Sequence, residues 1–214
     1  MSVLARFAAR TPEEAARRRF GVWAGVALII LLPLWWIWGA DVVAGLLRPI
    51  VGLVLRLFGL TGQIDVMDGG GWSIGTPLTQ GGAPLAFPLA QDNLRRLLLG
   101  FPLTLAFLTA PPRPERPWRT LAISIVVLSL TFAVCVAMTV WGGLAPMLSP
   151  DLAGVGVTIT AQPDQPPLHP FAAQVVIIGR YVAQSIAPLL SALILWATLN
   201  PLAMQTLVAE IKDE

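Results

Sequence analysis

The chain has 214 residues, of which 56% are hydrophobic and only 12% are charged. A soluble domain carries about 25% charged residues, so this composition excludes an ordinary soluble protein, and the long apolar runs indicate a membrane protein. The net charge is +2, but the basic residues gather beside apolar runs, which is typical of a topology signal and excludes a nucleic-acid-binding surface. A single cysteine, Cys135, excludes an internal disulfide and a cysteine-cluster metal site.

The chain begins with a basic segment followed by an apolar one. Five arginines lie within the first nineteen residues, and Thr11 and Pro12 before two glutamates indicate the start of a helix. Residues 21–40, GVWAGVALIILLPLWWIWGA, are uncharged and long enough to cross a bilayer. A signal peptide is the alternative, but the length, the tryptophans and the lack of a small-residue cleavage site favour an uncleaved anchor.

The next segment, residues 41–93, is expected outside the bilayer. Its first part, up to residue 60, is apolar but contains Asp41, Arg48 and Arg56. A helix on the membrane surface, or one packed on the end of the bundle, is therefore less costly than a second full span. Alternating residues on either side of DGGG predict a β-hairpin whose glycines supply the positive φ of the turn. The Gly- and Pro-rich sequence that follows the hairpin is predicted to be a loop.

Three further spans are expected. The first, residues 94–110, is short, with Arg95 and Arg96 at its outer edge and with glycine and proline as kink positions. Residues 120–141 form an unambiguous span, and residues 171–200 form the last one. Between these two spans, the stretch GVGVTITA alternates like a strand and could pair with the hairpin.

The distribution of arginine predicts the orientation. Arginines are concentrated in the N-terminal segment and in residues 111–119, whereas residues 142–170 contain neither lysine nor arginine. The positive-inside rule therefore places both termini in the cytoplasm. We predict an all-α polytopic protein of the bacterial inner membrane, with four transmembrane helices and a small outward β-hairpin-like element. The expected segments are a cytoplasmic helix (1–20), the first span (21–40), an interfacial helix and periplasmic β-like segment (41–93), the second span (94–110), a cytoplasmic loop (111–119), the third span (120–141), a periplasmic loop (142–170), the fourth span (171–200) and a cytoplasmic tail (201–214).

Cys135, His169 and Arg180 are the one combination that suggests catalysis. They could serve as nucleophile, base and oxyanion stabiliser in an intramembrane cysteine transpeptidase or protease-like enzyme. However, a lone cysteine in a span is usually a small hydrophobic residue, and no neighbour in the sequence would activate this thiol. We therefore expect no catalytic residues.

Other kinds of site also lack the residues that they need. A single histidine cannot form a bis-histidine haem or a zinc site, and DGGGW lacks the lysine and helix of a phosphate-binding loop. We therefore expect no metal and no cofactor. A small-solute carrier is a further alternative, although a carrier needs polar groups on several spans and here only the last span is strongly polar.

The last span contains an unexpected polar group. Helical spacing places Gln174, Tyr181, Gln184 and Ser185 on one face, with Arg180 at its edge. Exposing this arginine to lipid would cost about 2.5–3.5 kcal/mol on insertion scales, so the face must meet other spans, a cavity or a partner. Two interpretations stay open: Arg180 anchors the helix by pairing with Asp151, Asp164 or a headgroup phosphate, or all five residues form a partner-binding surface.

Three stretches together resemble one family, the exosortase H-associated membrane proteins. NLRRLLLGFPLTLAFLTA is similar to a short span of that family, RYVAQSIAPLLSALILWATLN resembles its last span, and IDVMDGGGWSIGTPL resembles its outward β-like segment. The resemblance covers residues 61–110 and 171–200. The Arg-rich opening AARRRF and the long Pro-rich segment 142–170 depart from the pattern.

The resemblance implies a small multi-span protein without catalytic residues. Members of the family accompany exosortase H, an intramembrane cysteine transpeptidase of bacterial envelopes. We therefore expect a non-enzymatic accessory subunit that binds an exosortase-type protein-sorting or processing enzyme. Its other expected partner is the lipid bilayer.

Overall fold

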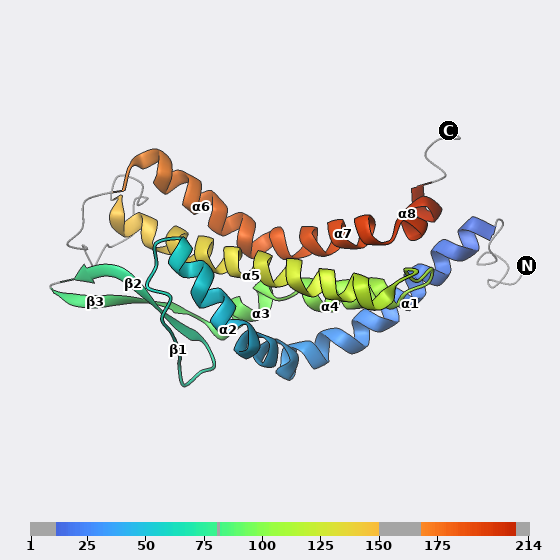
Figure 1. Ribbon diagram of the computed structural model, residues 1–214, viewed down its shortest axis with the longest axis horizontal. Coiled ribbons are helices and arrows are strands. Elements are labelled where there is room, and N and C mark those ends of the chain that lie inside the picture. The colour runs from blue at the N-terminus through green and yellow to red at the C-terminus, as the bar shows by residue number, and fades with distance from the viewer. Residues whose placement is uncertain (1–11, 81, 150–167, 209–214) are drawn as a thin grey trace, which may run out of the picture.

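The computed structural model describes residues 12–80, 82–149 and 168–208, which form an elongated helical bundle with a small sheet at one end (Figure 1). The elements in chain order are α1 (Pro12–Leu34), the π-helical segment η2 (Trp35–Gly39), α2 (Ala40–Leu57), β1 (Ile64–Val66), β2 (Trp72–Gln80), β3 (Ala83–Leu89), α3 (Gln91–Leu97), α4 (Gly100–Thr109), α5 (Pro117–Leu148), α6 (Pro170–Ser185), α7 (Ala187–Leu199) and α8 (Pro201–Val208).

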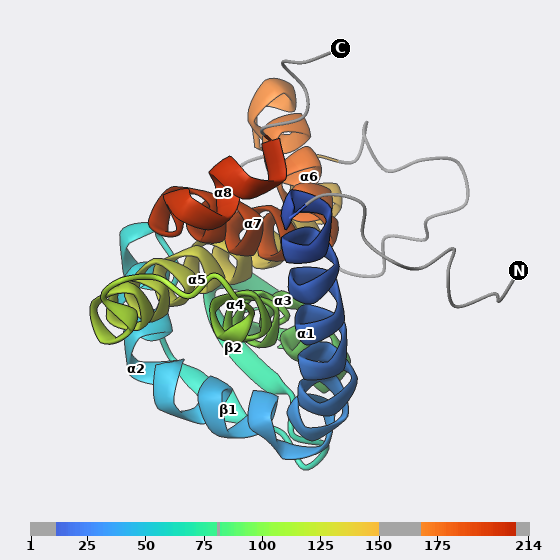
Figure 2. The same cartoon turned by 90° about the vertical axis from the view of Figure 1, so that its right-hand side faces the viewer.

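The first long apolar helix is continuous but changes direction. Residues Glu14–Leu57 form one helical stretch of 44 residues. Figures 1 and 2 show that α1 and α2 point in different directions on either side of η2. Pro33 lies just before this turn and has no backbone N–H to donate, and π-helical segments and prolines are the usual causes of sharp kinks. The chain therefore changes direction at η2 and continues toward the sheet end of the molecule, where α2 packs against α5 (Figure 1).

Helix α2 packs on the bundle through one face only. Ala44, Val51 and Leu55 are buried, whereas Leu46 and Leu57 on the opposite side are exposed. The sequence left open whether this segment lies at the interface or in the bundle. Helix α2 combines the two positions. One face packs against α5 in the bundle, and the opposite face exposes apolar side chains, as an interfacial helix would.

Four spans are not confirmed. Within the described residues, two helices are long and apolar enough to cross a membrane, Glu14–Leu57 and Pro117–Leu148, and the pair α6 and α7, bent by 62°, would make a third. The predicted span 94–110 is instead divided between α3 and α4. Helix α4 has ten residues, or about 15 Å, which is half of the roughly 30 Å hydrocarbon core. Pro102 explains the division, because a helix continued from α3 would bring its ring against the carbonyl of Leu98.

The predicted hairpin is confirmed, and it belongs to a larger sheet. Among the described residues the sheet has three antiparallel strands in the order β1–β2–β3, and Val66 pairs with Trp72 across the first turn. In that turn Met67 N–H donates to the Gly71 carbonyl over 2.9 Å, and Gly70 has a φ of 76°. The glycine run therefore supplies the left-handed conformation that the turn requires.

The prediction of a loop after the hairpin is wrong, because the rest of β2 and all of β3 occupy it. Prolines suggested a loop, yet each one sits where a strand tolerates it. Pro84 and Pro88 lie on the edge strand β3, and Pro77 lies where the β2–β3 register is irregular, beyond the end of the short β1. The strand-like stretch GVGVTITA lies outside the described residues.

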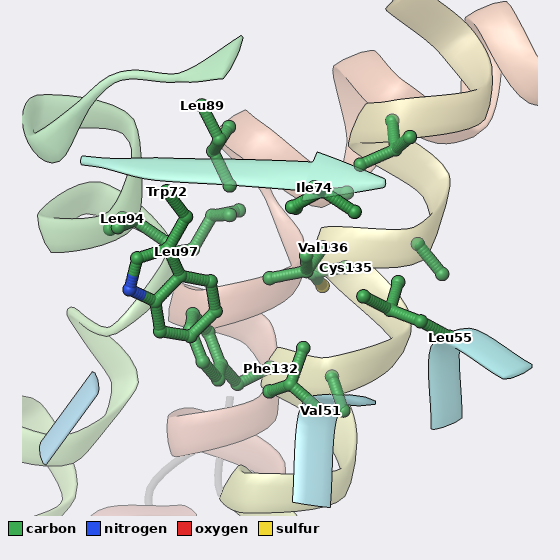
Figure 3. Packing of buried hydrophobic residues seen from close by; sticks show 14 of the residues in the cluster. Val51, Leu55, Trp72, Ile74, Leu89, Leu94, Leu97, Phe132, Cys135 and Val136 are labelled. Carbon is green, nitrogen blue, oxygen red and sulfur yellow. The ribbon is translucent and has the colours of Figure 1, made fainter. Parts of the chain in front are cut away.

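The sheet packs against the second half of α5. Figure 3 shows Trp72 and Ile74 of β2 facing Phe132 and Val136 of α5, with Leu55 of α2 beside them. The rings of Trp72 and Phe132 meet edge to face, with centroids 5.9 Å apart. The first half of α5 is largely exposed, whereas most of its second half is buried. Lipid can therefore contact the first half, while the sheet, α2 and α6 enclose the second.

Helix α6 packs closely on α5 through small residues. Gly142 and Ala145 of α5 are buried, as are Ala173 and Ala183 of α6. A Cβ atom added at Gly142 would lie 2.5 Å from the carbonyl oxygen of Val176. Small residues that allow such close approach are typical of helix pairs in membranes.

We predict that Gly142→Ala lowers the midpoint of thermal unfolding in detergent, because the added methyl group would push α6 away from α5. The matched control is Gly25→Ala, a second helical glycine, at which an added Cβ atom meets nothing within 4 Å. Alanine favours a helix over glycine by about 1 kcal/mol, so the control should be as stable as the wild type or more so. Equal midpoints for the two variants would contradict the close α5–α6 contact.

Candidate functional site

Helix α6 begins beside the end of α5. The backbone N–H of Leu168 donates to the Leu148 carbonyl over 2.9 Å, and the Ser149 hydroxyl donates to the Leu168 carbonyl over 2.6 Å. His169 is the N-cap, and its Nδ1 accepts the N–H of Phe171 over 3.3 Å. Three hydrogen bonds thus fix where α6 starts, and they give His169 a capping role.

Helix α6 ends at a bend of 62° before α7. Pro188 in the first turn of α7 has no N–H, so the carbonyl of Gln184 loses the donor that a continuous helix would provide. The bend therefore leaves a polar backbone group beside Gln184 and Ser185. Both side chains belong to the predicted partner-binding surface.

The five residues of that predicted surface do not all face the same way. Gln174, Tyr181 and Ser185 are exposed, with 67% of Tyr181 accessible. Arg180 and Gln184 are partly buried, and the Arg180 side chain lies against Gly142 of α5. We call these five residues together the α6 face. Sequence spacing grouped them, but it did not reveal which of them turns toward α5.

The contact between Arg180 and Gly142 defines the depth of the α6 face. A Cβ atom added at Gly142 would lie closer to the Arg180 side chain than to any other group, so the two residues are at the same height. Helix α5 rises about 35 Å between Arg119 and Gly142, which exceeds the roughly 30 Å hydrocarbon core. If Arg119 marks one membrane boundary, Arg180 lies at the opposite boundary and not at the midplane.

Arg180 forms no hydrogen bond or ion pair with any residue that the structure describes. Its hypothesised partners Asp151 and Asp164 lie outside the described residues. The apolar side chains of Ile178 and Val182 are exposed beside it. The α6 face therefore combines a cation that has no partner among the described residues, exposed polar groups and apolar area in one place.

A second charged group joins α2 to α3 and, unlike Arg180, contains an ion pair within the described residues. The Asp41 carboxylate accepts hydrogen bonds from Gln91 over 3.0 Å and from Arg95 over 2.9 Å, and the Arg95 guanidinium lies 5.8 Å from the ring centroid of Trp36. Arg95 was predicted to snorkel toward the interface. It instead ties α3 to α2, a contact that sequence reasoning missed because the partners are 54 positions apart.

The structure does not bring Cys135, His169 and Arg180 together. Cys135 is buried on the α5 surface that faces the sheet. His169 lies beside the end of α5, about 20 Å along that helix from Cys135. Arg180 lies beside Gly142, which is about 10 Å along α5 from Cys135. In the part of the chain that is described, no three His, Cys, Asp or Glu residues form a group that could hold a metal ion.

Comparison with known proteins adds one positive finding. No curated protein and no solved structure matches the chain. The family model described as exosortase H-associated membrane protein matches residues 14–202 of the 214. The match includes all of α1 except its first two residues, every element from η2 to α7 and the whole sheet, and it extends the resemblance noted in the sequence beyond residues 61–110 and 171–200. This chain therefore belongs to the exosortase H-associated membrane protein family.

Proposed function

We propose that the chain is a non-enzymatic accessory subunit of the bacterial inner membrane that binds exosortase H through the α6 face. The family description supports association with that enzyme. The separation of Cys135, His169 and Arg180 supports a role other than catalysis. The observation that carries the proposal is the partly buried Arg180, which has no partner in the part of the chain that the structure describes.

Arg180 is the expected centre of the contact with the partner. A guanidinium that is partly desolvated gains most from a carboxylate or carbonyl group that completes its hydrogen bonds. Tyrosine and arginine are enriched among the residues that dominate binding energy, and Tyr181 lies beside Arg180. Hydrogen bonds between side chains on membrane helices are worth around 0.6 kcal/mol each. Several such bonds and one charge pair would select a partner.

The arrangement of the ends supports the predicted orientation. Figure 1 shows the two described chain ends and the connection between α4 and α5 at one end of the molecule, with the sheet at the other. The arginine-rich segments lie at the first of these ends. We propose that this end is cytoplasmic and that the sheet and the start of α6 are periplasmic.

We predict that Arg180→Leu reduces co-purification of co-expressed exosortase H by about tenfold or more, because a lost charge in a desolvated contact costs about 2–5 kcal/mol. Arg180→Lys should be intermediate, since it keeps the charge but loses the planar fork. The matched control is Arg48→Leu, an exposed arginine on α2, which should leave recovery unchanged. Variants are compared at equal amounts of folded protein.

Undiminished recovery with Arg180→Leu would show that the residue is only a snorkelling anchor. Equal losses with Arg180→Leu and Arg48→Leu would point to a general effect of charge. Either result would contradict docking through the α6 face.

The orientation can be tested by cysteine labelling in a Cys135→Ala background. We expect Gly69→Cys, in the hairpin turn, to react with a membrane-impermeant maleimide in intact spheroplasts. Glu115→Cys, between α4 and α5, should react only after lysis. Both sites suit the test, because an added Cβ atom at Gly69 meets nothing within 4 Å and Glu115 is exposed. Labelling of Glu115→Cys from outside would reverse the proposed orientation.

The same background tests the enzymatic alternative. We predict that Cys135→Ala keeps exosortase H recovery and protein sorting in cells at wild-type levels, with a loss of about 1 kcal/mol in stability from the smaller core side chain. Loss of sorting at a normal protein level would instead identify Cys135 as a nucleophile.

A further inference from the structure

A pocket of about 380 Å³ lies between the start of α5 and the junction of α7 with α8. It is at the end of the molecule where Figure 1 shows the connection between α4 and α5, opposite the sheet. Asn200 is fully buried and forms part of its wall. Its Nδ2 donates to the Pro112 carbonyl over 2.8 Å, and its Oδ1 accepts the Ala203 N–H over 3.3 Å. These bonds tie the α4–α5 connection to the α7–α8 junction, so the two sides of the pocket are held together.

Charges of both signs line this pocket. Glu115, Arg116 and Arg119 are all exposed, so a ligand in the pocket can reach each of them. None of the three forms an ion pair with a residue that the structure describes. Glu115 and Arg119 are four positions apart, a spacing that pairs opposite charges within a helix, but α5 begins only at Pro117. The carboxylate therefore lies before the helix, and both guanidinium groups remain available to a ligand.

A buried hydroxyl group lies in the same pocket without a hydrogen bond. Thr120 is only 7% exposed, and its Oγ1 has no partner within the described chain. Ser129 and Thr139 show the usual alternative on α5, because they donate to the carbonyls of Ile125 over 2.6 Å and Cys135 over 2.8 Å. Buried hydroxyls normally have such a partner. The Thr120 hydroxyl is therefore a further polar group that a ligand in the pocket can engage.

The side of the pocket toward the bilayer is apolar. Ile123 and Leu199 line it, and Ile123 lies about 6 Å further along α5 than Arg119. With Arg119 at a membrane boundary, the charged groups lie at the depth of lipid headgroups. Ile123 then lies at the depth where the acyl chains begin. The pocket thus changes from charged to apolar in the same direction as a lipid molecule does.

We propose that this pocket binds the headgroup of phosphatidylethanolamine. Its phosphate pairs with Arg116 and Arg119, its ammonium group pairs with Glu115, and its acyl chains pass Ile123. Guanidinium groups bind phosphate oxygens through paired N–H groups, and a carboxylate accepts hydrogen bonds from an ammonium group. Only an ethylene group separates the phosphate from the ammonium, so one pocket can hold both.

The carboxylate in the pocket favours this headgroup over those of other phospholipids. A lipid with a net negative charge would place its phosphate near Glu115 without a cation to offset the repulsion. The ammonium group of ethanolamine has three N–H donors, whereas the quaternary ammonium of choline has none, and its methyl groups keep the positive charge away from a carboxylate. The volume of the pocket is near the lower end of the roughly 300–1,000 Å³ usual for small-ligand pockets. It therefore suits a headgroup whose acyl chains stay in the bilayer.

The test compares three lipids with the same acyl chains: dioleoyl phosphatidylethanolamine, phosphatidylcholine and phosphatidylglycerol. We expect native mass spectrometry of the full chain to show about fivefold tighter binding of phosphatidylethanolamine than of either other lipid. The effect is no larger because ion pairs that water can reach are weak. Glu115→Gln should remove this preference. The double variant Arg116→Gln/Arg119→Gln should weaken the binding of all three lipids, since each of them carries a phosphate.

Two matched controls remove charges elsewhere. Arg113→Gln changes an exposed arginine of the same α4–α5 connection, which lines a different pocket beside Trp23. Asp68→Asn changes an exposed carboxylate at the hairpin turn. Both controls should keep the affinity and the preference of the wild type. Because all of these side chains are exposed, every variant should also keep the wild-type midpoint of thermal unfolding in detergent.

Four results would overturn the proposal. The wild type could bind the three lipids equally or prefer phosphatidylglycerol, or Glu115→Gln could keep the preference for phosphatidylethanolamine. Arg113→Gln could weaken binding as much as the double variant does, which would show a general attraction of this end for phosphate. Glycerophosphoethanolamine, the same headgroup without acyl chains, could displace the lipid at equal concentration, which would identify a soluble phosphoester as the ligand. We expect no displacement under that condition.

Discussion

The fold depends on what packs against the second half of α5. On one side, Gly142 lets the backbone of α6 approach, and on the other, Phe132 receives the ring of Trp72. Packing between membrane helices relies on close contact, because lipid tails are as apolar as leucine side chains. The face of the sheet that meets α5 extends this contact with the buried side chains of Trp72 and Ile74. Helix α5 thus holds α6 and the sheet in place, and through them the α6 face.

The sequence predicted the elements that local patterns determine. The apolar run of α5 and the DGGG turn of the hairpin each lie within one stretch of chain, so their structure follows from neighbouring residues. The division at Leu98 follows from the nearby Pro102, whereas the strand β3 depends on a partner more distant in the chain. Pro84 and Pro88 suggest a loop when read alone, and they fit a strand only because β3 is at the sheet edge.

The candidate sites were predictable to different degrees. Helical spacing grouped Tyr181 and Ser185 correctly as neighbours on α6, but the position of Arg180 over Gly142 follows from how α6 packs on α5. The ion pair between Asp41 and Arg95 joins two separate helices, so no local sequence pattern predicts it.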